Sequence, residues 1–537
     1  MGRQADRRLD QDGMINSVRR GTIGRREFLR NATATGLTVA AAQALWAKTA
    51  MAQAPKRGGT ARVAFASTSP TLTLDPIKTV NIPDLTHVRQ LGQELVALGP
   101  DLKLEPQLAT AWEASAADGS EWVFELRKGV EFHNGKPFTS ADVVYSMGRH
   151  LTKDSESVHK AQMAQIDEVS ADGAHAVRFK LKSPNFEFPV AFTGGRTVVI
   201  PEGHTDFINF VGTGGFKLGE FQPGVRTLFV RHENYWNADR VHLDAIETFS
   251  ILDPTNRINA LVTGEADFIV GVDLNALPRL ENAANAETMF VRGGQNVHMV
   301  MMCDRAPTDN HDFRLAMKHL QDRQRVVDSV YKGYAQVGND YLLSPSHNEF
   351  SREIPVRPYD VDKAKYHLRQ AGAENPTIEI FTSTAAGPGG LEQALLFQQT
   401  AAAAGVTVNV QQAPAESYWS AIWRKRPIHG SHWNMRPTAE LQWSQLYMST
   451  APENEIEFRD ERVDRLVLQV RAERDEAKRM EIWHELQVIA HDEGGHLLAA
   501  HPDYIYAHAK SLKGLKPYPL GVGTSNIVSG EDLWLDT

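Results

Sequence analysis

Residues 104–147 read LEPQLATAWEASAADGSEWVFELRKGVEFHNGKPFTSADVVYSM, and this stretch alone predicts a strand, a tight turn and a helix. Residues 121–126 alternate polar and apolar side chains, which is the period of a half-buried strand. The Asn-Gly pair at 134–135 is typical of a tight turn with positive φ. Thr139 or Ser140 can cap the helix that follows. These local patterns indicate an α/β domain and no more.

The exact residues of this stretch are more informative than its pattern of polar and apolar side chains. QLATAWE and EWVFELRKGVEFHNGKPFTSADVVYSM resemble the signature of the family 5 extracellular solute-binding proteins of ABC importers, a group that includes dipeptide, oligopeptide, nickel and haem binders. Further stretches match the same family in the same order, so the resemblance extends from about Gly58 to about Ser525. They are GTGGFKLGEFQPG (212–224) with ENYW (233–236), RINALVTGEADFI (257–269), FRLAMKHLQDRQRVVDSVYKGYA (313–335) and YDVDKAKYHLRQAG (359–372).

The resemblance implies an α/β, two-lobed periplasmic binding protein of type II, similar to cluster C, with a small subdomain inserted in the first lobe. It implies that a solute is captured between the lobes by hinge closure and delivered to the permease subunits of an ABC transporter. The expected division is as follows: lobe I comprises residues 53–95, 212–294 and 505–537, the accessory subdomain residues 96–211, and lobe II residues 295–504.

Length and composition agree with such a protein. A chain of 537 residues is too long for one compact core, so two or three domains are expected. The single cysteine, Cys303, excludes an intramolecular disulfide and a cysteine-cluster metal site. Residues 1–52 carry nine Lys/Arg and four Asp/Glu, so the formal charge of −9 becomes −9 − 5 = −14 without them. A surface this acidic argues against nucleic acid and anionic lipid as partners.

The first 52 residues resemble an export signal. Arg25 and Arg26 form a twin-arginine pair, followed by Phe28 and Leu29. The mildly apolar segment 32–47 is too short to span a membrane. We therefore expect recognition by the twin-arginine translocase, cleavage near residue 53, no lipid attachment, and a freely periplasmic mature protein.

Apolar periodicity places several other elements. Residues 60–65 and 176–181 predict strands, and residues 297–302 predict a strand at the first hinge crossing. Residues 313–334 predict one helix, and residues 462–490 predict the longest helix of the chain. The glycine cluster at 212–215 lacks the Lys-Ser/Thr of a phosphate loop and is interpreted as a backbone crossing between domains.

The segment HGSHWNMRPT (429–438) is the most informative about the ligand. In peptide-binding relatives, the loop that opens with this tryptophan carries an aspartate three positions later, which holds the α-ammonium group of the ligand. Here the register is Trp433, Asn434, Met435, Arg436, and the 382–388 loop that should supply a partner arginine contains none. Arg436 is suited to a carboxylate or phosphate, which predicts an acidic ligand, or it is structural and pairs with Glu440 or Glu416.

The other candidate ligand-binding residues are Asn434, Trp433, Trp419, Thr68 and Thr384. The two tryptophans offer apolar cleft walls with a polar edge, and core packing is the alternative for each. The two threonines offer hydroxyl groups in loops expected near the cleft, with turn formation as the alternative for Thr68.

No catalytic residue, metal site or cofactor is predicted. The histidines of His491-Asp-Glu-Gly-Gly-His496 are five apart, and the Gly-Gly pair between them would break a helix, unlike a zinc protease motif. His429 and His432 remain open as a loop pair, and no Gly-x-Ser-x-Gly occurs. The alternatives to an acidic-solute binder are a peptide or metal-chelate binder and, from another class, a secreted hydrolase exported by the twin-arginine route.

Overall fold

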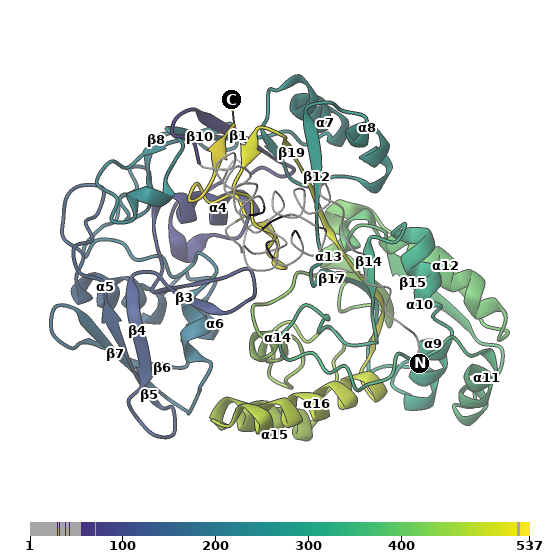
Figure 1. Ribbon diagram of the computed structural model, residues 1–537. Helices are drawn as coiled ribbons and strands as arrows, with labels where there is room; N and C mark the ends of the chain where they lie inside the picture. The colour runs from purple at the N-terminus through teal and green to yellow at the C-terminus, as the bar shows by residue number, and fades with distance from the viewer. Residues whose placement is uncertain are drawn as a thin grey trace.

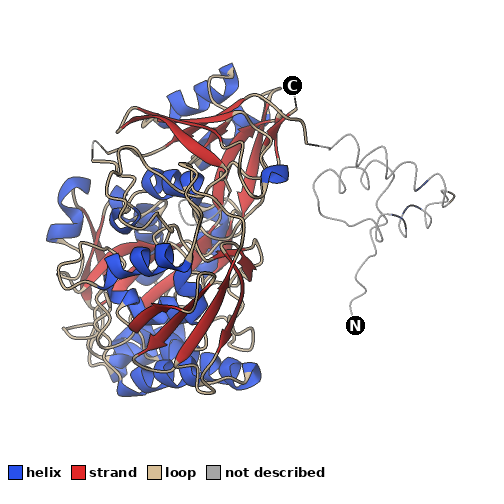
Figure 2. Ribbon diagram, turned by 90° about the vertical axis from the view of Figure 1, so that its left-hand side faces the viewer, coloured by secondary structure: helices blue, strands red, loops and turns tan. Residues whose placement is uncertain are grey.

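The computed structural model describes residues 55–69, 71–522 and 527–536, with Leu29, Ala32, Thr38 and Ala42. These residues form two lobes, each built on a mixed β-sheet, with a smaller four-stranded sheet beside the first lobe (Figure 1). Figure 2 shows the same arrangement from the side, with helices packed around the sheets. Within the described residues, no helix has both the length and the apolar character that a membrane crossing requires.

The first lobe is organised around β1 (Thr60–Phe65), the strand predicted at 60–65. β1 pairs in parallel with β10 on one side and β11 on the other, and its inner residues are buried. The sheet order is β12 (Ala286–Val291), β19 (Tyr504–Ala509), β11 (Phe268–Ile269), β1, β10 (Ala245–Ser250), β9 (Arg226–Arg231) and β8 (Phe216–Gln222). Its helices are α4 (Ile82–Leu91), α7 (Pro254–Thr263) and α8 (Leu277–Glu281).

The stretch 104–147 folds as its local patterns predict. β5 (Glu121–Leu126) buries one alternating face, the Gly135 φ is 81°, and α5 (Ser140–Leu151) begins after Thr139. Thr139 and Asp142 form a capping box, which satisfies two backbone donors at the helix start. The four-stranded sheet has the order β4 (Ala109–Ala114), β5, β7 (Ala176–Leu181) and β6 (Ile166–Ala171), with α6 (Lys160–Met163) nearby.

The second lobe has a six-stranded sheet in which β13 (Asn296–Met301) lies near the centre and is buried along its whole length. The order is β14 (Ala335–Val337), β18 (His496–Pro502), β13, β17 (Ile428–Trp433), β15 (Thr377–Thr382) and β16 (Thr407–Gln412). The helices are α9 (His311–His319), α10 (Arg323–Arg325), α11 (Val361–Gln370), α12 (Gly390–Ala402), α13 (Ala415–Ala421), α14 (Ala439–Leu446), α15 (Glu461–Ala472) and α16 (Glu476–Asp492). Two-stranded pairs complete the fold: β2 (Val96–Leu98) with β3 (Leu104–Pro106), and β20 (Leu512–Lys513) with β21 (Trp534–Leu535).

Two long predicted helices are each broken. The helix expected over 313–334 ends at His319, and a new turn begins at Arg323, continuing into a π-helical segment, η5 (Val326–Val330). The helix expected over 462–490 is α15 and α16, separated at residues 473–475. Asp322 and Asp475 each accept a hydrogen bond from a backbone N–H three residues later, and such caps start a new helix within a continuous apolar period.

Two chain segments connect the large sheets, one from β12 to β13 and one from β18 to β19. The first crossing, residues 292–295, immediately precedes the strand predicted at the hinge. The segments lie against each other, since a Cβ added at Gly293 would stand 2.6 Å from the Tyr504 ring. The glycine cluster at 212–215 is likewise a close backbone approach, because a Cβ on Gly212 would lie 2.1 Å from the Leu91 carbonyl oxygen.

Candidate functional site

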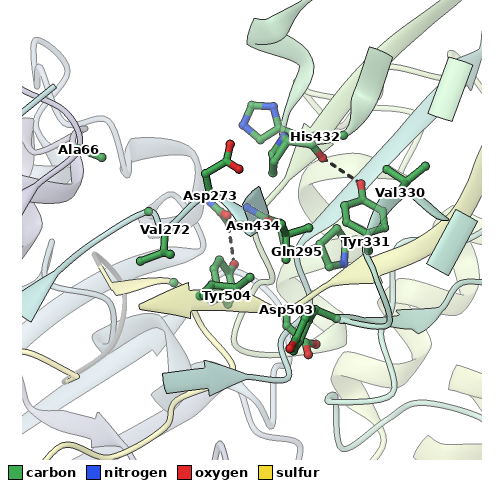
Figure 3. A pocket seen from close by; sticks show the side chains of 18 of the residues that line it. Ala66, Val272, Asp273, Gln295, Val330, Tyr331, His432, Asn434, Asp503 and Tyr504 are labelled. Atoms are coloured by element: carbon green, nitrogen blue, oxygen red, sulfur yellow. Dashed lines mark hydrogen bonds between the residues drawn. The ribbon is translucent and has the colours of Figure 1, made fainter. Parts of the chain in front are cut away.

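A cleft of about 1220 Å³ lies between the two lobes. Segments 80–85 and 270–275 line it from the first lobe, and segments 325–332 and 388–399 line it from the second. The crossing at residues 502–506 forms part of its surface, and Figure 3 shows Tyr504 from this crossing reaching toward the second lobe. The cleft therefore presents one ligand with side chains from both lobes and from the hinge.

Two of the predicted ligand-binding residues, Asn434 and Arg436, line this cleft. Both follow β17, so the strand delivers the loop 434–438 to the cleft edge. Asn434 Oδ1 accepts a hydrogen bond of 3.1 Å from the Tyr504 hydroxyl, the dashed contact in the centre of Figure 3. This bond links the second-lobe loop to the crossing between the lobes.

The other four predicted residues do not line the cleft. Trp433 donates its indole N–H to Glu455 in the second-lobe interior, and Trp419 is 40% exposed and packs against His432, which does line the cleft. The Thr68 hydroxyl donates to the Gly224 carbonyl, and Thr384 is exposed in a short 3₁₀ turn. The two tryptophans thus pack behind the cleft surface, and neither threonine is among the residues that line it.

Arg436 is only partly neutralised. Its Nε donates to Gln445 Oε1 at 2.6 Å, and its nearest carboxylate oxygen, on Glu453, is 3.7 Å away. The guanidinium lies 5.6 Å from the centre of the Trp433 ring, a cation–π distance. Burial lowers the pKa of Arg436, and Glu453 offsets part of that shift. Neither Glu440 nor Glu416 forms an ion pair with Arg436 in the described chain, and Glu440 instead binds Arg471.

Arg196 is a cleft residue that the sequence analysis missed. It follows the short helix η2 (Phe188–Phe192) and lines the same cleft as Arg436. Among the described residues its guanidinium makes one hydrogen bond, from Nε to the Thr79 carbonyl at 3.1 Å, and no ion pair. Burial lowers the pKa of Arg196, and the positive charge of Arg436 lowers it further. Two guanidinium groups from different lobes therefore share the cleft.

Asp503 is a second missed cleft residue. It stands between β18 and β19 on the crossing and lines the cleft. Burial raises its pKa to about 6, against the lowering effect of Arg292. No local motif marks Asp503 or Arg196 in the sequence, because each is brought to the cleft by chain topology.

A buried cluster behind the cleft has the residue types of a metal site. His298, Glu455 and His496 have ligand atoms within 4.8 Å of one another. Both Glu455 oxygens already accept hydrogen bonds, and both histidine Nδ1 atoms lack a partner among the described residues. A metal-binding histidine normally has its second nitrogen held. The cluster therefore has the character of a buried, hydrogen-bonded carboxylate.

The other histidines from the sequence analysis do not form a joint site. His491 ends α16 and contacts Asp492, whereas His496 opens β18. His429 and His432 lie on strand β17 and not in a loop, and His429 is buried while His432 lines the cleft.

Comparison with known proteins identifies the class. Residues 103–454, more than half of the chain, match the model of the bacterial extracellular solute-binding proteins, family 5. Heme-binding protein A of Haemophilus influenzae is 26% identical over 459 residues, covering 78% of this chain and 82% of the relative. The dipeptide-binding protein of Escherichia coli is 25% identical over 464 residues, covering 78% and 84%.

A solved structure shares the fold. The periplasmic binding protein DppA from Helicobacter pylori, in complex with peptide STSA, aligns with a TM-score of 0.75 and 22% identity, covering 90% of this chain and 99% of that one. The predicted α/β two-lobed fold and the predicted solute-binding role in an ABC importer are thus confirmed, and the hydrolase alternative has no support. The chain belongs to family 5 of the bacterial extracellular solute-binding proteins.

Proposed function

We propose that this protein captures an acidic solute between its lobes and delivers it to the permease subunits of an ABC transporter. One observation carries the proposal: Arg196 and Arg436 line the same cleft from opposite lobes, and Arg436 lowers the pKa of Arg196. Two like charges at partly buried positions are unfavourable unless an anion lies between them. A carboxylate there would accept charge-assisted hydrogen bonds from both sides.

The arrangement links ligand binding to the position of the lobes. An anion bound to Arg436 alone contacts the second lobe, and an anion bound to both arginines holds the lobes together. The ligand therefore favours the closed arrangement by the free energy of the second contact. The existing contact between the lobes at the cleft edge, from Lys332 Nζ to Asn275 Oδ1 at 2.8 Å, is exposed and contributes little by comparison.

The first test is the identity of the solute that co-purifies with the protein from its native periplasm, determined by native mass spectrometry and fragmentation. We expect a compound with at least one carboxylate or similar acid. At about a hundred times its dissociation constant, that compound should stabilise the fold by roughly 2.7 kcal/mol through mass action. It should also reduce the radius of gyration measured by X-ray scattering. A bound solute without any acidic group would contradict the proposal.

We further propose that the protein is freely periplasmic and exported by the twin-arginine translocase. Arg25, Arg26 and Phe28 lie outside the described residues, and Leu29 is described only as part of a helical segment, so the proposal rests on the sequence motif. Replacing Arg25-Arg26 by Lys-Lys should leave the precursor in the cytoplasm, measured by fractionation and immunoblotting. Normal periplasmic levels of the double variant would contradict this route of export.

We also propose that the protein binds its solute without catalysis. We propose the same division of the chain as above: lobe I (53–95, 212–294, 505–537), accessory subdomain (96–211) and lobe II (295–504). Turnover assays on ester, peptide and phosphate substrates should show no activity above that of a matched buffer. Limited proteolysis should cut first near the proposed boundaries.

A further inference from the structure

A carboxylate without a counter-ion stands on the surface of the cleft. Asp503 Oδ1 is buried and has no hydrogen-bond partner, and within the described chain no arginine, lysine or histidine forms an ion pair with the Asp503 side chain. Its backbone N–H is used, since it donates to the Tyr334 carbonyl at 3.0 Å. The backbone at this position is therefore fixed while the side chain is left unsatisfied.

A buried carboxylate oxygen without a donor is costly, because it has lost water without gaining a hydrogen bond. That cost explains why burial raises the pKa of Asp503 to about 6, with Arg292 only partly opposing the shift. Other acids on the cleft surface differ in this respect. Asp273 accepts a hydrogen bond from the Asn275 backbone N–H at 2.7 Å, and Glu392 is exposed to water.

Asp503 and the two arginines line the same cleft, so the cleft surface carries side chains of both charges. Asp503 and Tyr504 are adjacent on the crossing, and both line the cleft (Figure 3). The Tyr504 hydroxyl reaches Asn434, two residues before Arg436, and the charge of Arg436 acts on Tyr504. One molecule in the cleft can therefore face the arginines with one group and Asp503 with another.

We infer that Asp503 binds a cationic group of the solute, so that the ligand is a zwitterion with a carboxylate at the arginine pair and an ammonium or guanidinium group at Asp503. This inference rests on the proposed function, because the acidic group is the one assigned to Arg196 and Arg436. It narrows the ligand class to amino-acid derivatives and similar compounds that carry both charges. A cation at Asp503 would supply the donors that its carboxylate lacks.

The test uses the purified full mature protein, freed of solute by partial unfolding and dialysis, and calorimetric titration with defined probes. The probes are Ala-Glu, Glu-Glu and γ-Glu-Glu, each with a free amine and as the N-acetyl derivative. Glutarate and citrate serve as acids without a cation, and Ala-Ala amide serves as a cation without an acid. Each probe is titrated into the wild-type protein, Asp503→Asn, and the control Glu392→Gln, which removes an exposed carboxylate from the cleft surface.

We expect free-amine probes to bind the wild-type protein and Glu392→Gln about 30-fold or more tightly than their N-acetyl partners, the usual effect of removing one member of a buried charge pair. In Asp503→Asn the two forms should bind within a few-fold of each other. The melting temperature of ligand-free Asp503→Asn should equal or exceed that of wild type, because the variant removes an unsatisfied carboxylate. This measurement distinguishes the loss of a ligand contact from a loss of stability.

The other outcomes are distinguishable. If N-acetyl probes, glutarate or citrate bind as tightly as the free amines, the zwitterion inference is wrong and the acidic-solute proposal stands. If only Ala-Ala amide binds, the acidic-solute proposal is wrong, and the zwitterion inference falls with it. If no probe binds the wild-type protein below millimolar concentration, both are wrong for this class of compounds. Retained discrimination in Asp503→Asn would place the cation elsewhere in the cleft.

Discussion

The two sides of Trp433 show contrasting ways of burying charge. On the inner side, the Glu455 carboxylate is fully buried and accepts hydrogen bonds from Trp423, Ser431 and Trp433, with His298 Nε2 2.8 Å away. On the cleft side, the guanidinium of Arg436 lies over the same indole ring, and its one ion-pair partner in the described chain, Glu453, is 3.7 Å away and half-exposed. One charge is saturated with protein partners and the other is not.

This difference distinguishes a charge that stabilises the fold from one that is available to bind a ligand. Burial raises the pKa of Glu455, but the hydrogen bond with His298 and the nearby His496, 3.6 Å away, outweigh burial and hold the pKa well below its usual value. The carboxylate therefore stays ionised and keeps the end of β17 in place. At Arg196 burial and the like charge of Arg436 lower the pKa, and the carboxylates of Glu94 and Glu453 offset only part of that shift. A bound anion would supply further compensation.

The largest expected effect is on the saturated side. Glu455→Ala should lower the free energy of unfolding by about 3–5 kcal/mol, because it leaves buried donors on Trp423, Ser431 and Trp433 without an acceptor. Urea unfolding of the ligand-free protein, followed by tryptophan fluorescence, measures it. Glu416→Ala, an exposed acid on α13, is the control and should change stability by no more than about 0.5 kcal/mol. A loss below 1 kcal/mol for Glu455→Ala would break the comparison.

Arg436→Ala should have the opposite profile. Affinity for the co-purified acidic solute should fall by at least about 2 kcal/mol, the cost of removing one partner of a buried charge pair. Stability without ligand should fall by about 1 kcal/mol or less, since the variant loses one hydrogen bond to Gln445 and a long, partly exposed ion pair to Glu453. Arg436→Lys should recover only part of the affinity, because an ammonium group cannot make two parallel contacts to a carboxylate. Unchanged affinity with a large loss of apo stability would make Arg436 structural.

Arg196→Gln should reduce affinity by a smaller amount, about 1.5–3 kcal/mol, the range for a hydrogen bond to a charged group. Ligand-free stability should not fall, because the variant removes one of two like charges and keeps a side-chain donor for Thr79. Combined with Arg436→Ala in a double-mutant cycle, the losses should be non-additive by 0.5 kcal/mol or more, since both residues hold one anion. Additive losses would indicate two separate contacts.

The sequence was sufficient to predict the strands and helices that depend on local patterns of residues. The alternation at Trp122, Phe124 and Leu126 was sufficient for β5, and Thr139 with Asp142 was sufficient for the start of α5. The breaks at Asp322 and Asp475 were missed because the apolar period continues across them, although each aspartate is a helix-capping residue. Arg436 was identified because it occupies the loop position at which peptide-binding relatives carry an aspartate. Arg196 and Asp503 could not be predicted, since their role depends on segments that are distant in the chain and adjacent only in the fold.

The smallest expected effect concerns a charge that is neither saturated nor placed in the cleft. Glu187 lies where the accessory subdomain contacts the second lobe, next to the hydrogen bond of 2.8 Å from the Phe186 N–H to the Arg471 carbonyl. Burial, followed by the charges of Glu349 and Glu440, raises the pKa of Glu187 to about 8, while Arg479 and Thr438 oppose the shift. Between the unfolded value of 4.5 and about 8, the native protein therefore binds more protons than the unfolded chain, and this group's contribution to stability falls as pH rises.

Buried histidines with lowered pKa values, such as His87 and His501, act in the opposite direction below pH 6.5, so the wild-type curve alone does not isolate Glu187. The difference in melting temperature between Glu187→Gln and wild type isolates it, because the histidines are common to both proteins. We expect that difference to increase from pH 5 to pH 8 and to correspond to less than about 1 kcal/mol, since Glu187 is only half-buried and solvent screens its neighbours. A difference that is flat or decreases with pH would show that Glu187 is compensated at the lobe contact, as Glu455 is in the interior.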